Sequence, residues 1–244
     1  FRLTSDADGL TSDTITKTLN KGQTFVLEAI PSQHTANNEG WIGASITSTN
    51  PIAVSLGGLN YGIQTSAAAR DSGIDQIVPT DLLGKEYVFI RGKGSNESEF
   101  PVIVAYQNGT DVYAGGVLIA TINDGDYLEI PGSNYSSNSE GANMFVETSK
   151  EVYAYQCLAG QSANKTVGMN FIAPLNCLLP SVLDEIPAID QIAGASSGES
   201  AVTIIASTST SDANIQLTDD SGVVTLPASS PVAGTSDWKT FYKT

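Results

Sequence analysis

The chain has 244 residues and a mass of 25.4 kDa, with 41% apolar and only 15% charged residues. Its 26 acidic and 11 basic residues give a net charge of −15, and such a surface repels both nucleic acid and anionic membranes. No run reaches the ~18 apolar residues that a membrane-spanning helix needs, and the first residues lack a signal-peptide pattern, so we expect a mature or excised chain with no direct membrane insertion.

Short runs rich in β-branched and aromatic residues predict strands along most of the chain, each bounded by Gly, Asn or Ser. The clearest of these strands are residues 86–90, 102–106 and 127–130. No segment shows a long helical period, and the best short helical candidates would be one or two turns. The local patterns therefore predict a chain built from strands.

Three polar segments separate these strands and are typical of tight turns. Asn108-Gly109 is the strongest hairpin signal, because Asn and Gly tolerate the positive φ of a type I′ turn. Residues 123–126, Asn-Asp-Gly-Asp, form a second such turn. We also predict a hairpin around Ser149-Lys150, between the apolar runs that precede and follow it.

The chain shows internal similarity at a spacing of about 100 residues. Residues 43–55 align with 142–155, apolar over apolar, and weaker matches are found elsewhere at the same spacing. We therefore predict the end of a first β repeat in residues 1–60, a second repeat in 61–160, and a partial third repeat in 161–244.

The predicted fold class is all-β, with tandem, divergent, antiparallel repeats that each form a sandwich-like or barrel-like unit of about 100 residues. A β-propeller-like arrangement is the alternative. It is less favoured, because propeller blades repeat every 40 to 50 residues or so.

Several segments resemble a known family. Four of them look like the amino-terminal domain of the IgG-Fc-binding protein family, namely residues 84–90, 75–79, 105–112 and 51–54. Residues 168–180 are similar to the form that this domain takes in large secreted surface proteins of Bacteroidetes bacteria. The resemblance runs from about residue 41 to residue 206 and implies an extracellular, cell-surface or matrix module of a longer polypeptide, with an adhesive role. It carries over no Fc-contacting residue.

The chain has two cysteines, Cys157 and Cys177, separated by 20 positions. A bridge between two loops would suit an exported protein, whereas two buried thiols would suit a cytosolic one. Low Lys content and many Ser, Thr and Asn residues favour the bridge, which would stabilise the fold by about 3 kcal/mol. Zinc is not expected, because there is no CxxC and the only histidine is His34.

We predict that the protein is not an enzyme. A Ser or Cys nucleophile needs a positioned base, and the one histidine, His34, lies in a polar connection. A glycoside hydrolase is a distant alternative that needs two carboxylates at one site. The candidate pair, Glu28 and Glu129, instead occupies equivalent positions in two different repeats.

No cofactor is predicted, with calcium as the alternative, because carboxylates and turn carbonyls are its ligands. The densest acidic cluster contains Asp6, Asp8 and Asp13, which are the weak metal candidates. This segment lacks the residues that an EF-hand loop requires at its fifth, sixth and twelfth positions. Ordinary turn chemistry is the competing explanation, because Asp8 aligns with Asn108 of the next repeat.

The predicted function is adhesion or display through loops, and the alternative is a carbohydrate-binding module with aromatic loop contacts. Tyr61 and Tyr135, both in loops rich in Gly, Asn and Ser, are the candidate ligand contacts. The long connection at residues 57–73 adds Arg70 and Asp71, although such a loop can also cover a sheet edge. Expected partners are a surface glycan, a protein ligand, or other copies or domains of the same surface protein.

Overall fold

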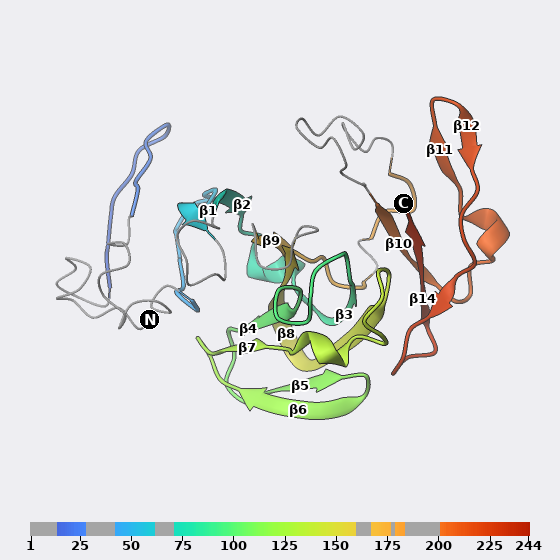
Figure 1. Ribbon diagram of the computed structural model, residues 1–244. Helices are drawn as coiled ribbons and strands as arrows, with labels where there is room; N and C mark the ends of the chain where they lie inside the picture. The colour runs from blue at the N-terminus through green and yellow to red at the C-terminus, as the bar shows by residue number, and fades with distance from the viewer. Residues whose placement is uncertain (1–13, 28–41, 62–70, 160–166, 177–178, 184–200) are drawn as a thin grey trace.

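The computed structural model describes residues 14–27, 42–61, 71–159, 167–176, 179–183 and 201–244. Within these residues the chain consists of strands β1 to β14 and three short 3-10 turns, with no α-helix (Figure 1). All strand pairs are antiparallel, so the predicted all-β, antiparallel class is confirmed. None of the described residues belongs to a helix with the length and apolar character needed to cross a membrane.

The central sheet is organised around one long strand. Its members are β3 (Gly84–Ile90), β4 (Pro101–Ala105), β5 (Thr110–Ala114), β6 (Val117–Ile122), β7 (Tyr127–Glu129), β8 (Asn143–Ala159) and β9 (Val167–Phe171). Along one edge, β8 pairs first with β5 and then with β4; along the other, it pairs first with β3 and then with β9. β6 and β7 complete the two ends, next to β5 and β4.

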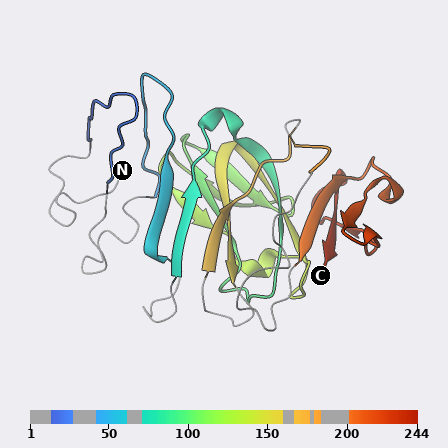
Figure 2. The same ribbon diagram turned by 90° about the horizontal axis from the view of Figure 1, so that it is seen from above.

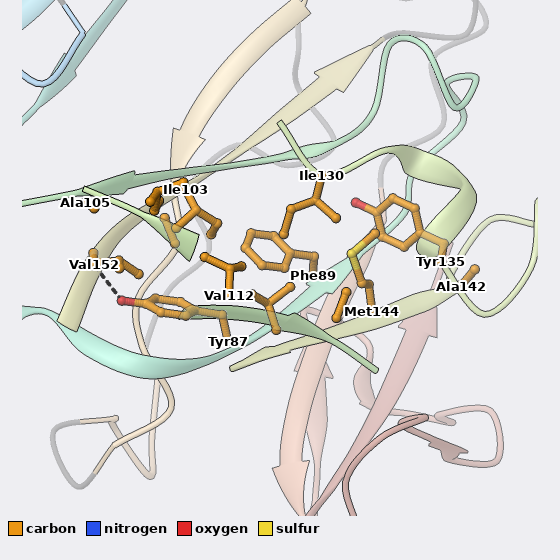
Figure 3. Packing of buried hydrophobic residues seen from close by; sticks show 14 residues of the cluster. Tyr87, Phe89, Ile103, Ala105, Val112, Ile130, Tyr135, Ala142, Met144 and Val152 are labelled. Atoms are coloured by element: carbon orange, nitrogen blue, oxygen red, sulfur yellow. Dashed lines mark hydrogen bonds between the residues drawn. The ribbon is translucent and has the colours of Figure 1, made fainter. Parts of the chain in front are cut away.

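The sheet curls around a single core (Figure 3). Inward residues of both halves of β8 share this core with residues of β3, β4 and β5, among them Phe89, Ile103 and Val112. The hydroxyl of Tyr87 donates a hydrogen bond of 2.7 Å to the carbonyl oxygen of Val152, which ties β3 to the second half of β8. Strict alternation of buried and half-buried residues along β5 shows why the sequence pattern predicted a strand here.

The three predicted turns lie together at the corner where the sheet bends. The backbone N–H of Gly109 donates to Asn123 Oδ1, and that of Asp124 donates to Asn108 Oδ1, each at 3.1 Å. Lys150 Nζ donates to the carbonyl oxygen of Asn108, so the third turn reaches the same corner. Turns are therefore located correctly at Asn108-Gly109 and at residues 123–126, whereas Ser149-Lys150 lies inside strand β8.

Two predicted hairpins are wrong. The segments on either side of Ser149-Lys150 belong to one strand, β8, whose register against β3 shifts at this point. The strands on either side of Asn108-Gly109 follow the same edge of β8 and do not pair with each other. A residue with positive φ, such as Gly109 at 66°, suits a bend between sheet halves as well as a hairpin turn, so the local pattern did not distinguish them.

A hairpin that was not predicted joins β5 to β6. Its turn is Gly115-Gly116, with φ of 56° and 82°, and Ala114 faces Val117 across it. Gly-Gly between two apolar runs is a known signal for a type I′ turn. The signal was thus present in the sequence.

The C-terminal part of the chain covers one outer face of the central sheet. β10 (Val202–Ser207), β13 (Ser230–Pro231) and β14 (Trp238–Lys243) form one sheet, and β11 (Leu217–Asp219) pairs with β12 (Gly222–Val224). Trp238 and Tyr242 pack against Val88 and Phe145, which point away from the core. The Asn143 amide donates to Pro231 O at 3.1 Å and to Thr240 Oγ1 at 2.9 Å.

The N-terminal hairpin lies on the opposite side of the central sheet (Figure 2). It consists of β1 (Ser55–Tyr61) and β2 (Asp71–Gln76). The backbone N–H of Phe171, in β9, donates to Asp75 Oδ2 at 3.3 Å, and this contact joins the hairpin to the sheet. The described parts thus follow one another in a row, and the predicted repeat boundaries at residues 60 and 160 stay predictions.

Candidate ligand-binding surface

Aromatic side chains gather on the outer face of the β7-β4-β8-β9 part of the central sheet. Four half-buried rings form this surface, which we call the aromatic face: Tyr127, Tyr153, Tyr155 and Phe171. Directly opposite residues of antiparallel strands project to the same face. Tyr155 lies opposite Phe171, and the valines of β4 lie opposite the three tyrosines, so one face carries all four rings.

The alternation of β4 explains how this surface arises. Ile103 and Ala105 point into the core, and Val102 and Val104 point outward although they are also apolar. The wet face of an antiparallel sheet normally carries polar residues. Here a second apolar cluster lies outside the sheet, with Phe100, Val102 and Cys157 buried beneath Tyr127, Tyr155 and Met169. An apolar outer face of this kind indicates a contact surface.

The rings are held in defined positions. Tyr155 and Phe171 meet edge to face, with ring centroids 5.9 Å apart and an interplanar angle of 75°. The hydroxyl of Tyr153 donates to the carbonyl oxygen of Val78 at 3.1 Å. Burial raises the pKa of Tyr155 to about 12, and the charge of Asp75 adds to this effect, so the hydroxyl is neutral at physiological pH. The surface offers apolar contact and neutral hydroxyl groups.

Two carboxylates border the aromatic face. Glu129 is exposed and lies opposite Val102 in the register of β7 and β4. Asp75 accepts hydrogen bonds from the backbone N–H groups of Phe171 and Gln76. The strands β4, β7 and β9 contain no Lys or Arg. The arrangement can therefore bind a partner by stacking, hydrogen bonding and attraction of positive charge.

A comparison with protein families identifies the chain. The family model described as IgGFc binding protein matches residues 2–243. The chain belongs to the IgGFc-binding protein family. The resemblance expected from the sequence is therefore confirmed, and it extends over nearly the whole chain. Searches of curated proteins and of solved structures found no match.

Membership of the IgGFc-binding family makes this chain an extracellular binding module. That statement agrees with the predicted class of function. It does not name a ligand, and the residues that contact one have to be argued from the geometry.

One predicted contact residue of this IgGFc-binding family member lies in the core. Tyr135 is only 5% exposed, and its hydroxyl accepts a hydrogen bond of 3.0 Å from Gln156 Nε2. Burial raises the pKa of this hydroxyl, and the guanidinium of Arg91 lies 5.8 Å from the ring centroid. Tyr135 is therefore not part of the aromatic face, and its contact with a ligand stays a prediction. The turn Gly132–Asn134 directs it inward, which local polarity did not reveal.

The other predicted contacts lie in the N-terminal hairpin. Tyr61 and Asp71 are register partners at the ends of β1 and β2. Arg70 lies outside the described residues. The register thus brings two of the predicted residues to one end of the hairpin, and their contact with a ligand stays a prediction.

The weak metal candidates Asp6, Asp8 and Asp13 lie outside the described part of the chain. So do Glu28, of the candidate carboxylate pair, and His34, the one histidine. Within the described part, no three His, Cys, Asp or Glu side chains are grouped in a way that could hold a metal ion. Cys157 is buried, 1% exposed, beneath the aromatic face. Cys177 lies outside the described residues, so the bridge between the two stays a prediction.

The tyrosines and Phe171 of the aromatic face were not singled out from the sequence as contact residues. The sequence contained a partial indication of this surface, because β4 is apolar at every position, including those that point away from the core. It became specific only once the register placed the rings of three different strands side by side.

Proposed function

We propose that this chain is a non-catalytic adhesion or display module of a longer secreted surface protein, and that the aromatic face binds its partner. The proposal rests on the outward apolar cluster of an antiparallel sheet, in which Tyr127, Tyr155 and Met169 pack on Phe100, Val102 and Cys157, with the half-buried rings of Tyr153 and Phe171 on the same face. Rings of this kind supply most of the binding energy in protein interfaces.

The chemistry of the surface supports binding over catalysis. The Cys157 thiol lies in the apolar cluster beneath Tyr127 and Tyr155. Burial raises its pKa to about 12, with a further contribution from the charge of Glu129, so the thiol stays protonated. A protonated, enclosed thiol does not act as a nucleophile.

A protein ligand fits the ring geometry best. The edge-to-face arrangement of Tyr155 and Phe171 does not form a flat platform of coplanar rings. Protein side chains pack against mixed ring orientations readily. IgG Fc, which the family description names, is one protein ligand to test.

A carbohydrate ligand is the second candidate. Tyr127 and Glu129 are neighbours on β7, and a single ring beside a carboxylate can stack on a sugar and accept its hydroxyl hydrogen bonds. This candidate predicts that Tyr127→Ala has a larger effect on binding than Phe171→Ala.

The test is a binding assay with purified IgG Fc, a set of purified extracellular proteins and a glycan array. We expect saturable binding to a protein, and affinities about tenfold lower for Tyr155→Ala and Phe171→Ala. Phe25→Ala is the matched control, because Phe25 is a partly exposed aromatic residue of the N-terminal part. Glycan binding that Tyr127→Ala abolishes would establish the second candidate, and binding that none of these variants changes would contradict both.

A further inference from the structure

Strand β6 carries three consecutive exposed apolar residues at the edge of the central sheet. Val117, Leu118 and Ile119 are 65%, 53% and 38% exposed. Edge strands of natural proteins usually carry charged residues, especially Lys, or a Pro, and these prevent pairing with another chain. β6, with the sequence VLIATI, contains none of them.

The register shows that β6 is firmly held on one side and open on the other. Among the described strands it pairs only with β5. Ile122 is buried and Ala120 packs against the core, so the second half of the strand is anchored. Leu118 lies opposite Tyr113, and the register shifts just beyond this pair. The open edge is therefore a preformed row of main-chain hydrogen-bonding groups with apolar side chains around it.

The surroundings of this edge are acidic. Asp124 and Asp126 lie in the turn that follows β6, and the register places Asp111 and Glu147 on the next two strands, β5 and β8. Next to β6, Asp111 accepts a hydrogen bond of 2.6 Å from the Thr121 hydroxyl. Glu147 is exposed and faces Tyr113, one strand further in. A basic segment is attracted to such a place, and an acidic one is repelled.

The charge also argues against a second copy of this chain. Each copy carries a net charge of −15, so two β6 edges would approach with like charges around them. The turn end of β6 is already an interface within the chain, because a Cβ on Gly234 would lie 2.5 Å from the carbonyl carbon of Gly115.

We propose that the β6 edge binds an extended, basic segment of a partner protein, which adds a strand to the central sheet. Apolar residues of the segment pack on Val117, Leu118 and Ile119, and its Lys or Arg residues lie near Asp111 and Glu147. Main-chain hydrogen bonds hold the strand, and the side chains select its sequence. This surface is separate from the aromatic face and does not depend on the function proposed for it.

The experiment selects short random peptides, displayed on phage, against the purified chain. Selected peptides are expected to combine β-branched residues with Lys or Arg and to bind more weakly as ionic strength rises. Leu118→Lys is expected to lower their affinity about tenfold or more, since it places a charge at the apolar edge. Amide hydrogen exchange is expected to slow along β6 when a synthetic form of the peptide is bound.

The matched control is Val223→Lys, which places the same charge on β12, where Val223 is 71% exposed. Unchanged circular dichroism and thermal unfolding of both variants would show that each still folds. Peptides that bind Leu118→Lys as tightly as Val223→Lys would overturn the proposal. So would self-association of the chain, seen in analytical ultracentrifugation and abolished by Leu118→Lys, because it would assign the edge to a second copy.

Discussion

The two outer faces of the central sheet are both apolar, but only one of them is covered. On β3 and the first half of β8, Val88 and Phe145 point away from the core and are buried by residues of β14. On β4, the second half of β8 and β9, Tyr155 and Phe171 point away from the core and stay partly exposed. Outward apolar residues thus have two outcomes in this sheet. In one region another part of the chain covers them, and in the other they stay partly exposed and available to another molecule.

The difference lies in what each neighbouring part of the chain brings to the sheet. The C-terminal sheet contributes Trp238 and Tyr242 to the covered face, and Asn143 fixes its position by two hydrogen bonds. The N-terminal hairpin meets the other face through Asp75 and the carbonyl of Val78. Polar contacts at the border leave the rings accessible. An outward row of apolar residues on a strand therefore predicts that something covers it, but does not show whether the cover belongs to the same chain.

The sharpest test of this comparison removes one ring from each face. Phe145→Ala should lower the free energy of unfolding by about 3–5 kcal/mol, because it leaves a cavity between two packed sheets. Phe171→Ala should lower it by only about 1–2 kcal/mol, since its ring is already partly exposed. Equilibrium urea unfolding followed by circular dichroism measures both. Equal losses would mean that the two faces are equally covered.

A smaller effect is expected at the point where the C-terminal part touches the β5–β6 turn. Gly234 has φ of 91° and no room for a Cβ beside Gly115. Gly234→Ala should therefore combine backbone strain with overpacking and destabilise by about 2–4 kcal/mol.

Gly222→Ala is the control for this contact. Gly222 has φ of 114°, but a Cβ there would meet nothing within 4 Å. Strain alone should lower the free energy of unfolding by about 1–2 kcal/mol. The difference between the two variants in urea unfolding measures the contact, and no difference would show that the C-terminal part does not press on the turn.

A pH-dependent effect concerns the thiol beneath the aromatic face. Burial raises the pKa of Cys157 from 9.0 to about 12. Below pH 9 the thiol is protonated in both folded and unfolded chains, and its contribution to stability is complete. Between pH 9 and 12 the unfolded chain loses the proton that the folded chain keeps, so the free energy of unfolding falls. Urea unfolding at several pH values should show this fall relative to Cys157→Ala.

Thiol labelling supplies the control for that measurement. A buried free Cys157 should resist labelling in the native chain and react once urea unfolds it. If Cys157 is instead bridged to Cys177, neither thiol should react in urea until a reductant is added. In that case no thiol titrates, and the contribution attributed to Cys157 is absent.

Local sequence located most of the turns but not their partners. Asn108-Gly109 lies where the chain changes direction, as predicted, whereas Ser149-Lys150 lies inside β8, and both belong to the corner at which the sheet bends. The pattern specifies backbone angles and side-chain polarity. Whether the next strand pairs with the previous one depends on β8, which lies about 40 residues further along the chain than Asn108.

The amino-acid sequence by itself determined the all-β class, the short strands, the acidic surface and the family. It did so because strand propensity, alternation and charge are properties of neighbouring residues. Only the tertiary structure decided that Tyr135 is buried and Tyr155 is not, and that β6 ends the sheet with an open apolar edge. These outcomes depend on register and on which face another segment covers, and both are set by contacts between residues far apart in the chain.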